Sequence, residues 1–83
     1  MINVGEIDHE GPVPVYQQLA SILRDQIMSG TLRPGRPIPS ERTLVQNYGV
    51  AVGTIKKAIQ VLRDEGLVYT VIGRGVYVTQ QQR

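Results

Sequence analysis

Apolar side chains recur at intervals of three and four residues in three stretches of the chain, which is the spacing of one face of an α-helix. In residues 15–29 the apolar positions are Tyr16, Leu19, Ala20, Ile22, Leu23, Ile27 and Met28. In the next two stretches they are Leu44, Val45 and Tyr48, then Ile55, Ala58, Ile59 and Leu62. Each stretch is followed by a glycine, at Gly30, Gly49 and Gly66, which closes a helix without steric cost. We therefore expect three helices, with the first packed in the core or pairing at a dimer interface.

The second and third helices are separated by only a few residues, which is typical of a helix-turn-helix motif. Ser40 is a suitable N-cap for the second helix, because its hydroxyl can accept a hydrogen bond from a free amide of the first turn. The third helix carries polar residues away from its apolar stripe, at Thr54, Lys56, Lys57 and Gln60. We interpret this polar side as a face that enters a nucleic-acid groove.

β-Branched and aromatic residues dominate residues 67–79 on both sides of Gly73, Arg74 and Gly75, which predicts a two-stranded hairpin. We expect its packed face to consist of Tyr69, Val71, Val76 and Val78, although a shift of one residue in register would change that set. The fold class is therefore α+β, a winged helix-turn-helix with three helices plus a C-terminal β-hairpin wing. We expect the domain over residues 12–79, a mobile N-terminal arm over 1–11 and a C-terminal tail over 80–83.

The charges are distributed unevenly along the 83 residues. Three of the seven acids lie in the first ten residues, whereas all nine Lys and Arg lie beyond residue 20, which leaves +5 from Gly11 onward. A basic surface favours a polyanion such as nucleic acid, although charge alone is equally compatible with a solvated surface. Arg33 and Arg36, in the proline-glycine loop 31–39, fit either phosphate contact or solvation. In the same loop, Ile38 is a candidate for a short bridge to the sheet.

Candidate catalytic chemistry is sparse. The chain has no cysteine, and its one histidine, His9, is interpreted as a solvated residue. There is no Ser–His–acid set, no metal-ligand cluster, and no glycine loop at a helix N-terminus. We therefore expect no enzymatic activity, no cofactor and no metal site.

Seven short motifs resemble the DNA-binding domain of the GntR family of bacterial transcription regulators. They are PVYQ at 14–17, GTLRPG at 30–35, PSER at 39–42, YGV at 48–50, GTIK at 53–56, EGLV at 65–68 and GRGVYV at 73–78. The resemblance implies a sequence-specific DNA-binding repressor in the bacterial cytoplasm, associated with the nucleoid. Its partner would be double-stranded DNA with an inverted-repeat operator, bound by a homodimer that forms in solution or only on DNA.

The resemblance also implies roles for individual residues. Helix 52–65 would read the major groove, with Thr54 and Lys56 at base edges and Gly53 in the same motif. Arg42 would contact a phosphate or a guanine, and Lys57 a phosphate. The wing at 73–75 would enter the minor groove, where Gly73 and Gly75 let the backbone approach and Arg74 provides the charge.

The chain departs from the family pattern at the start of the third helix. Family members commonly have Ser-Arg where this chain has Ala51-Val52. Ala51 cannot cap the helix, which costs on the order of 1 kcal/mol, and Val52 is suited to a thymine methyl. Lys56 replaces an arginine and loses the bidentate fork that reads guanine.

Two further questions stay open from the sequence. The effector domain of GntR regulators has no counterpart here, so the chain is either the DNA-binding part of a longer protein or a short regulator. The alternative function is a winged-helix protein-interaction module without direct DNA readout, for which the apolar pair Ala51 and Val52 gives some support.

Overall fold

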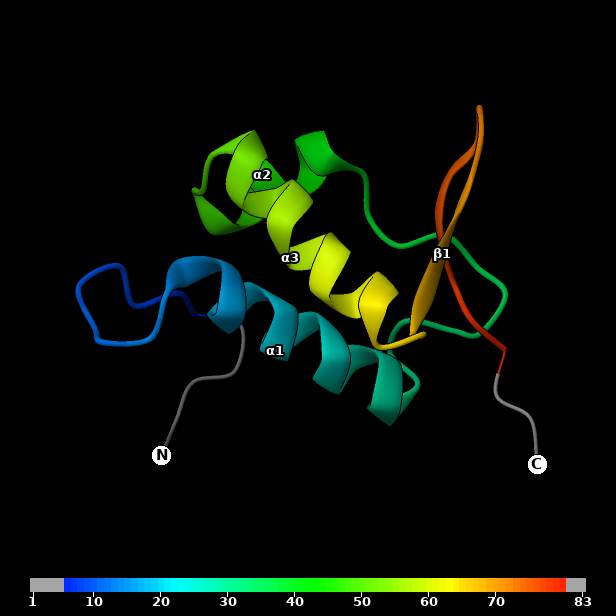
Figure 1. Ribbon diagram of the computed structural model, residues 1–83, viewed down its shortest axis with the longest axis horizontal. Helices are drawn as coiled ribbons and strands as arrows, with labels where there is room; N and C mark the ends of the chain where they lie inside the picture. The colour runs from blue at the N-terminus through cyan, green and yellow to red at the C-terminus, as the bar shows by residue number, and fades with distance from the viewer. Residues whose placement is uncertain (1–5, 81–83) are drawn as a thin grey trace.

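The computed structural model describes residues 6–80 as three helices followed by a two-stranded antiparallel hairpin (Figure 1). The elements are α1 (Val15–Ser29), α2 (Glu41–Tyr48), α3 (Val52–Asp64), β1 (Val68–Val71) and β2 (Gly75–Val78). This arrangement confirms the predicted α+β winged helix-turn-helix. The expected arm and tail extend into residues 1–5 and 81–83, which lie outside the described residues.

Helix α3 is the centre of the packing, since it contacts α1, α2 and β1. In Figure 1, α1 runs along one side of α3, and the hairpin stands at the C-terminal end of α3. All four residues of the predicted α3 stripe are buried: Ile55, Ala58, Ile59 and Leu62. From α1 they meet Leu19, Ala20, Leu23 and Ile27. Met28 was expected on the same face of α1 but is 62% exposed, because it lies one turn after Arg24 at the edge of that face, whereas its neighbour Ile27 follows Leu23 and is buried.

The turn between α2 and α3 forms as its residues predict. The Ser40 hydroxyl accepts a hydrogen bond from the Thr43 amide at 3.1 Å and so caps α2. Gly49 ends α2 in the left-handed conformation, with φ +67°, where a side chain would be strained. Ala51 then occupies the N-cap of α3 without a side-chain hydrogen bond. A stable cap on α2 and a missing one on α3 are therefore both confirmed.

The packed face of the hairpin differs from the prediction on its first strand. Val68 pairs with Val78 and both are buried, whereas Tyr69 pairs with Tyr77 on the opposite face and is 43% exposed. The prediction was right for Val76 and Val78 but wrong for Tyr69 and Val71. Val68, Val76 and Val78 pack against the core, while Val71 shares the outer face with the two tyrosine rings, whose centroids are 6.1 Å apart.

The loop between α1 and α2 is hydrogen-bonded to β2 of the hairpin without forming a strand of its own. Pro37 forms an isolated antiparallel bridge with Tyr77, and the Ile38 amide donates to the Val76 carbonyl at 2.8 Å. Ile38 itself is buried in the core. The bridge expected at Ile38 thus forms around Pro37 and Ile38, and it fixes the hairpin relative to the start of α2.

The described part of the N-terminal arm lies against the start of α1. Gln18 accepts from the Asp8 amide at 2.7 Å and donates to the carbonyls of Asp8 and Val13 at 2.8 and 2.7 Å. Ile7 packs against the hydrophobic core. One glutamine side chain therefore holds both ends of the turn that leads into the helix.

Candidate nucleic-acid interface

Arg42 and Arg74, which are far apart in the sequence, line one groove between the start of α2 and the hairpin. The groove has a volume of about 580 Å³, and its lining also includes Ser40, Ile59 and Val76. Both arginines are exposed. Because an arginine presents five donors and is always charged, two of them facing one groove favour a phosphate-bearing ligand.

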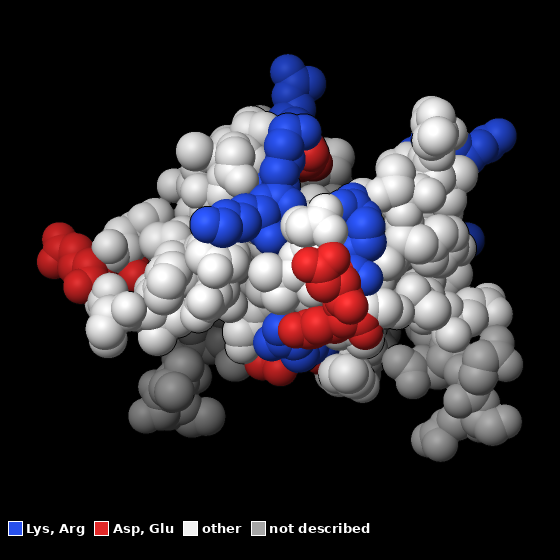
Figure 2. Space-filling view, viewed as in Figure 1, with Lys and Arg blue, Asp and Glu red and all other residues white. Residues whose placement is uncertain are grey.

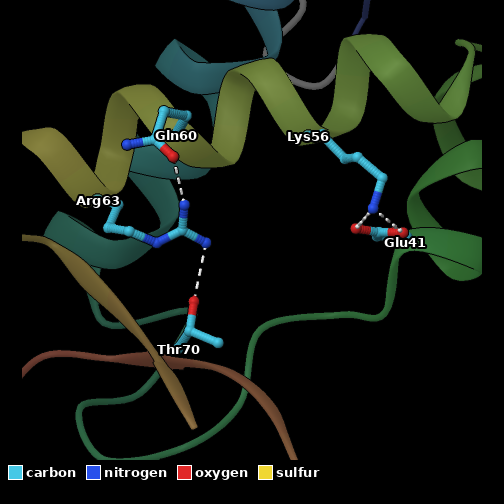
Figure 3. Close-up of polar contacts among 5 residues, drawn as sticks. All are labelled: Glu41, Lys56, Gln60, Arg63 and Thr70. Atoms are coloured by element: carbon cyan, nitrogen blue, oxygen red, sulfur yellow. Dashed lines mark hydrogen bonds and ion pairs between the residues drawn. The ribbon is translucent and has the colours of Figure 1, made fainter. Parts of the chain in front are cut away.

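Lys56 lines a second groove, which shares Ile59 and Val76 with the first. Its ammonium group is already paired. Its Nζ is 3.0 Å from Oε2 and 3.3 Å from Oε1 of Glu41, the first residue of α2 (Figure 3). The side chains remain 63% and 43% exposed, so this is a surface ion pair. Such a pair contributes only about 0–1 kcal/mol, which leaves Lys56 able to exchange Glu41 for another anion.

Lys57 points to the other side of α3. Its Nζ lies 4.3 Å from the centroid of the Tyr16 ring on α1, a cation–π contact. Thr54 is half-buried on the same helix. The structure therefore does not gather all the predicted residues at one point: Lys56 lies beside α2, and Lys57 lies beside α1.

The first turn of α3 is open to the surroundings. Val52 is 44% exposed, and a side chain added at Gly53 would meet nothing within 4 Å. The amide groups at this end lack a side-chain cap, because the N-cap is Ala51. Free amides at a helix N-terminus bind anions, so this turn is suited to close approach of a phosphate or a base edge.

A hydrogen-bonded chain joins α3 to the wing. Arg63 donates from Nη2 to Oγ1 of Thr70 at 2.8 Å and from Nη1 to Oε1 of Gln60 (Figure 3). Gln60 in turn donates to Asp64 at 2.7 Å. Arg63 Nε is buried and has no hydrogen-bond partner within residues 6–80. Arg63 therefore fixes the position of β1 relative to the exposed face of α3.

A second link joins the C-terminal end of α3 to α1. Arg24 donates from Nε and Nη2 to the two carboxylate oxygens of Glu65, at 2.8 and 2.7 Å. These hydrogen bonds lower the pKa of the Glu65 carboxyl and raise the pKa of the Arg24 guanidinium. The pair stabilises the end of α3 away from the candidate interface.

Charges of both signs lie on the face seen in Figure 2. Lys and Arg side chains lie over α2, beside α3 and at the hairpin. Asp and Glu lie at the N-terminal turn, over the C-terminal part of α3 next to a basic side chain, and among the basic side chains over α2. Along the side formed by α2, the start of α3 and the wing, Arg42, Lys56 and Arg74 outnumber Glu41, which favours a polyanion there.

From the sequence, neither Glu41 nor Arg63 was expected at this site. Arg63 could have been found from the sequence, because Lys56, Gln60 and Arg63 are spaced for one side of a helix. The partner of Lys56 could not have been found in this way, because Glu41 lies 15 residues away on another helix. Within residues 6–80 no group of three His, Cys, Asp or Glu is placed to hold a metal ion, and no helix is long and apolar enough to cross a membrane.

Three helices with a helix-turn-helix, a hairpin wing and basic side chains on both define the class of winged-helix DNA-binding domains. The sequence model described as "Bacterial regulatory proteins, gntR family" matches residues 15–78. The chain belongs to this family, which consists of transcriptional regulators.

Individual relatives agree with the family assignment. The chain is 38% identical to the HTH-type transcriptional repressor NagR of Bacillus subtilis over 74 residues, which are 89% of this chain and 30% of NagR. It is 30% identical to the repressor YtrA of Bacillus subtilis, covering 94% of this chain and 60% of YtrA. The chain thus spans less than two thirds of these relatives.

A solved structure with DNA is also similar. The DNA-binding domain of AraR in complex with operator ORX1 superposes with a TM-score of 0.82 at 35% identity. The match covers 94% of this chain and 100% of the AraR domain. YtrA of Sulfolobus acidocaldarius superposes with a TM-score of 0.84, covering 96% of this chain and 84% of that one.

Proposed function

We propose that this chain represses transcription by sequence-specific binding of its α2–α3–wing face to double-stranded DNA. The observation that carries the proposal is the common groove of Arg42 and Arg74, whose lining combines one cation from the helix-turn-helix with one from the wing. A DNA backbone carries one negative charge per roughly 1.7 Å of axis, so cations from two elements can act on one duplex. The AraR domain bound to its operator supports this choice of ligand.

We assign the roles by position. Val52, Gly53, Thr54 and Lys56 face the bases of the major groove, and Arg42 and Lys57 contact phosphates. Arg74 enters the minor groove between Gly73 and Gly75, whose φ angles of +80° and +125° are open to glycine but strained for other residues. To contact DNA, Lys56 must release Glu41 and Lys57 must release the ring of Tyr16. Both contacts are at the surface and weak enough for DNA to replace them.

Two copies are expected on an inverted-repeat operator. A single half-site offers few base contacts, and specific affinities are usually reached by dimers with half-sites about one helical turn apart. The dimer forms either before binding or on the operator. The setting is the bacterial cytoplasm, at the nucleoid, with no enzymatic activity of the domain itself.

A winged helix that binds only protein is the competing function, and Val52 with Ala51 at the start of α3 favours it. Three cations around the α2–α3–wing face, Arg42, Lys56 and Arg74, oppose it, and Lys57 adds a fourth on the α1 side of α3. The two functions differ in their dependence on salt, because only DNA binding releases condensed counterions.

The test is fluorescence anisotropy with a duplex selected from a random library, followed over a salt series. The logarithm of the association constant should fall linearly with the logarithm of salt, and Arg42→Ala should flatten that line by about one unit per half-site. Arg24→Gln is the matched control, since it removes the same charge on the α1 side. If no duplex is enriched, or if both variants behave alike, the proposed interface is wrong.

A further inference from the structure

The apex of the wing is formed by Ile72 and Gly73, whereas the sequence motif Gly73-Arg74-Gly75 is centred on Arg74. The Arg74 amide donates to the Val71 carbonyl at 2.9 Å, which closes a four-residue turn with Ile72 and Gly73 at its central positions. Gly73 has φ +80°, and no described residue other than glycine has a positive φ. A positive φ only at the third position defines a type II turn, which requires the glycine.

Ile72 is 94% exposed, more than any other large apolar side chain that the structure describes. The glycines on both sides of Arg74 leave open space where a Cβ would lie, with nothing within 4 Å. The wing therefore ends in a narrow tip that carries two side chains, one branched and apolar and one cationic. The minor groove of B-DNA is about 6 Å wide, and a tip with few side chains suits it.

Resting on the function proposed above, we infer that Ile72 is a specificity-determining residue that makes the wing prefer A·T over G·C base pairs in the minor groove. The floor of the groove at A·T pairs carries only the acceptors adenine N3 and thymine O2. A G·C pair adds the 2-amino group of guanine, which donates. An isoleucine over that group covers a donor without accepting from it, and a buried donor without a partner is costly.

Arg74 also favours A·T base pairs, but through electrostatic attraction. Narrow A·T-rich minor grooves have an enhanced negative potential that attracts arginine. That attraction weakens as salt screens it, whereas the contact of an apolar side chain with the groove floor does not depend on charge. The two contributions are therefore separable: preference for A·T that persists at high salt belongs to Ile72.

The experiment begins with selection from a library of random duplexes of about 30 base pairs, roughly three helical turns. It uses the wild-type protein, Ile72→Ala, Ile72→Ser and the control Met28→Ala, which shortens an exposed side chain on α1. Hydroxyl-radical footprints locate the minor-groove positions that the wing covers. The best wild-type duplex is then remade with A·T, G·C or inosine·C at those positions, and affinities are measured at low and high salt.

Inosine decides the question, because an inosine·C pair lacks the 2-amino group and shows the major groove of G·C with the minor groove of A·T. The wild type and Met28→Ala should bind the A·T and inosine·C duplexes alike and the G·C duplex about fivefold more weakly, the lower end of the cost of one wrong pair. Ile72→Ala should reduce the difference in affinity between the A·T and G·C duplexes. At high salt this variant should bind the two duplexes equally. Ile72→Ser, whose hydroxyl can accept from guanine, should tolerate G·C.

Two results overturn the inference while leaving the proposed function intact. One is an inosine·C duplex that binds as weakly as G·C, which would place the readout in the major groove. The other is a ratio of A·T affinity to G·C affinity that is the same in both Ile72 variants as in the wild type. If no duplex is enriched by any of the proteins, the proposed function fails and this inference falls with it.

Discussion

Lys56 of the candidate recognition helix lies 3.0 Å from Glu41 at the start of α2. A carboxylate thus lies on a face whose other charged side chains, Arg42, Lys56 and Arg74, attract polyanions. On a duplex, Lys56 either keeps this partner and presents a neutral pair, or it turns to DNA and leaves Glu41 facing phosphate. Either way, Glu41 restrains electrostatic binding by the α3 face.

We expect Glu41→Gln to strengthen binding to random-sequence duplex DNA. The change frees the Lys56 ammonium for phosphate and removes one negative charge, so the salt dependence of the association constant should steepen by about one unit. Fluorescence anisotropy over a salt series measures both effects. Glu65→Gln is the matched control, because it makes the same change in the ion pair with Arg24, on the other side of the domain. Equal slopes for the two variants would show that Glu41 does not restrain binding.

The link between α3 and the wing gives a second prediction. Thr70→Val removes the oxygen that accepts from Arg63 and leaves a half-buried guanidinium without that partner. We expect a loss of about 1 kcal/mol in the free energy of unfolding and faster hydrogen exchange in the hairpin amides. Thr79→Val, the same change at the end of the hairpin, is the control. Unchanged exchange in Thr70→Val would show that the loop around Ile38 holds the wing by itself.

The helices could be predicted from the sequence because their apolar residues have a single spacing. Every residue expected in the α3 stripe is buried, and Ser40 and Gly49 take the roles that their chemistry predicts. The hairpin register could not be predicted, because apolar residues occupy adjacent positions at Val68 and Tyr69. Alternation, which identifies the inner face of a strand, is then absent. In the structure Val68, Val76 and Val78 pack inward, whereas Val71 lies on the outer face with the two tyrosines.

The candidate site was predictable only as a set of residue types. The motifs placed Arg42 and Arg74 at one face because each lies in a recognisable turn or cap. The sequence gives no information on side-chain partners from other elements, so it predicted neither Glu41 beside Lys56 nor Tyr16 beside Lys57. Ile72 was overlooked because the motif is centred on Arg74, whereas the hydrogen bond that closes the turn begins at Val71.

The register of the hairpin is itself testable by a pair of alanine substitutions. Val68 is 2% exposed, so Val68→Ala should lower the free energy of unfolding by about 2 kcal/mol through lost burial and a cavity. Tyr69→Ala should cost about 1 kcal/mol or less, mainly the aromatic contact with Tyr77. Urea unfolding followed by circular dichroism measures both. A larger loss of unfolding free energy for Tyr69→Ala than for Val68→Ala would favour the register in which Tyr69 faces the core.

The Arg24–Glu65 pair predicts a dependence of stability on pH. The hydrogen bonds from Arg24 lower the pKa of Glu65 in the folded state, so the pair stabilises the fold above the ordinary glutamate pKa of about 4.3. This contribution is lost as the pH falls through the lowered pKa, because the protonated carboxyl no longer pairs. The urea midpoint of the wild type should exceed that of Glu65→Gln at neutral pH and converge with it in acid. Parallel curves at all pH values would contradict the assignment.

The uncapped start of α3 predicts a substitution that stabilises the protein. Ala51 has φ −72° and ψ 154°, the extended conformation of an N-cap, so Ala51→Ser should place a hydroxyl where it accepts from the first turn. A gain of about 1 kcal/mol corresponds to a rise in melting temperature of roughly 4–8 °C for a domain of this size. Ser40→Ala, which removes the existing cap of α2, should lower it by a similar amount. If Ser40→Ala lowers the melting temperature and Ala51→Ser does not raise it, the free amides of α3 are already satisfied by another group.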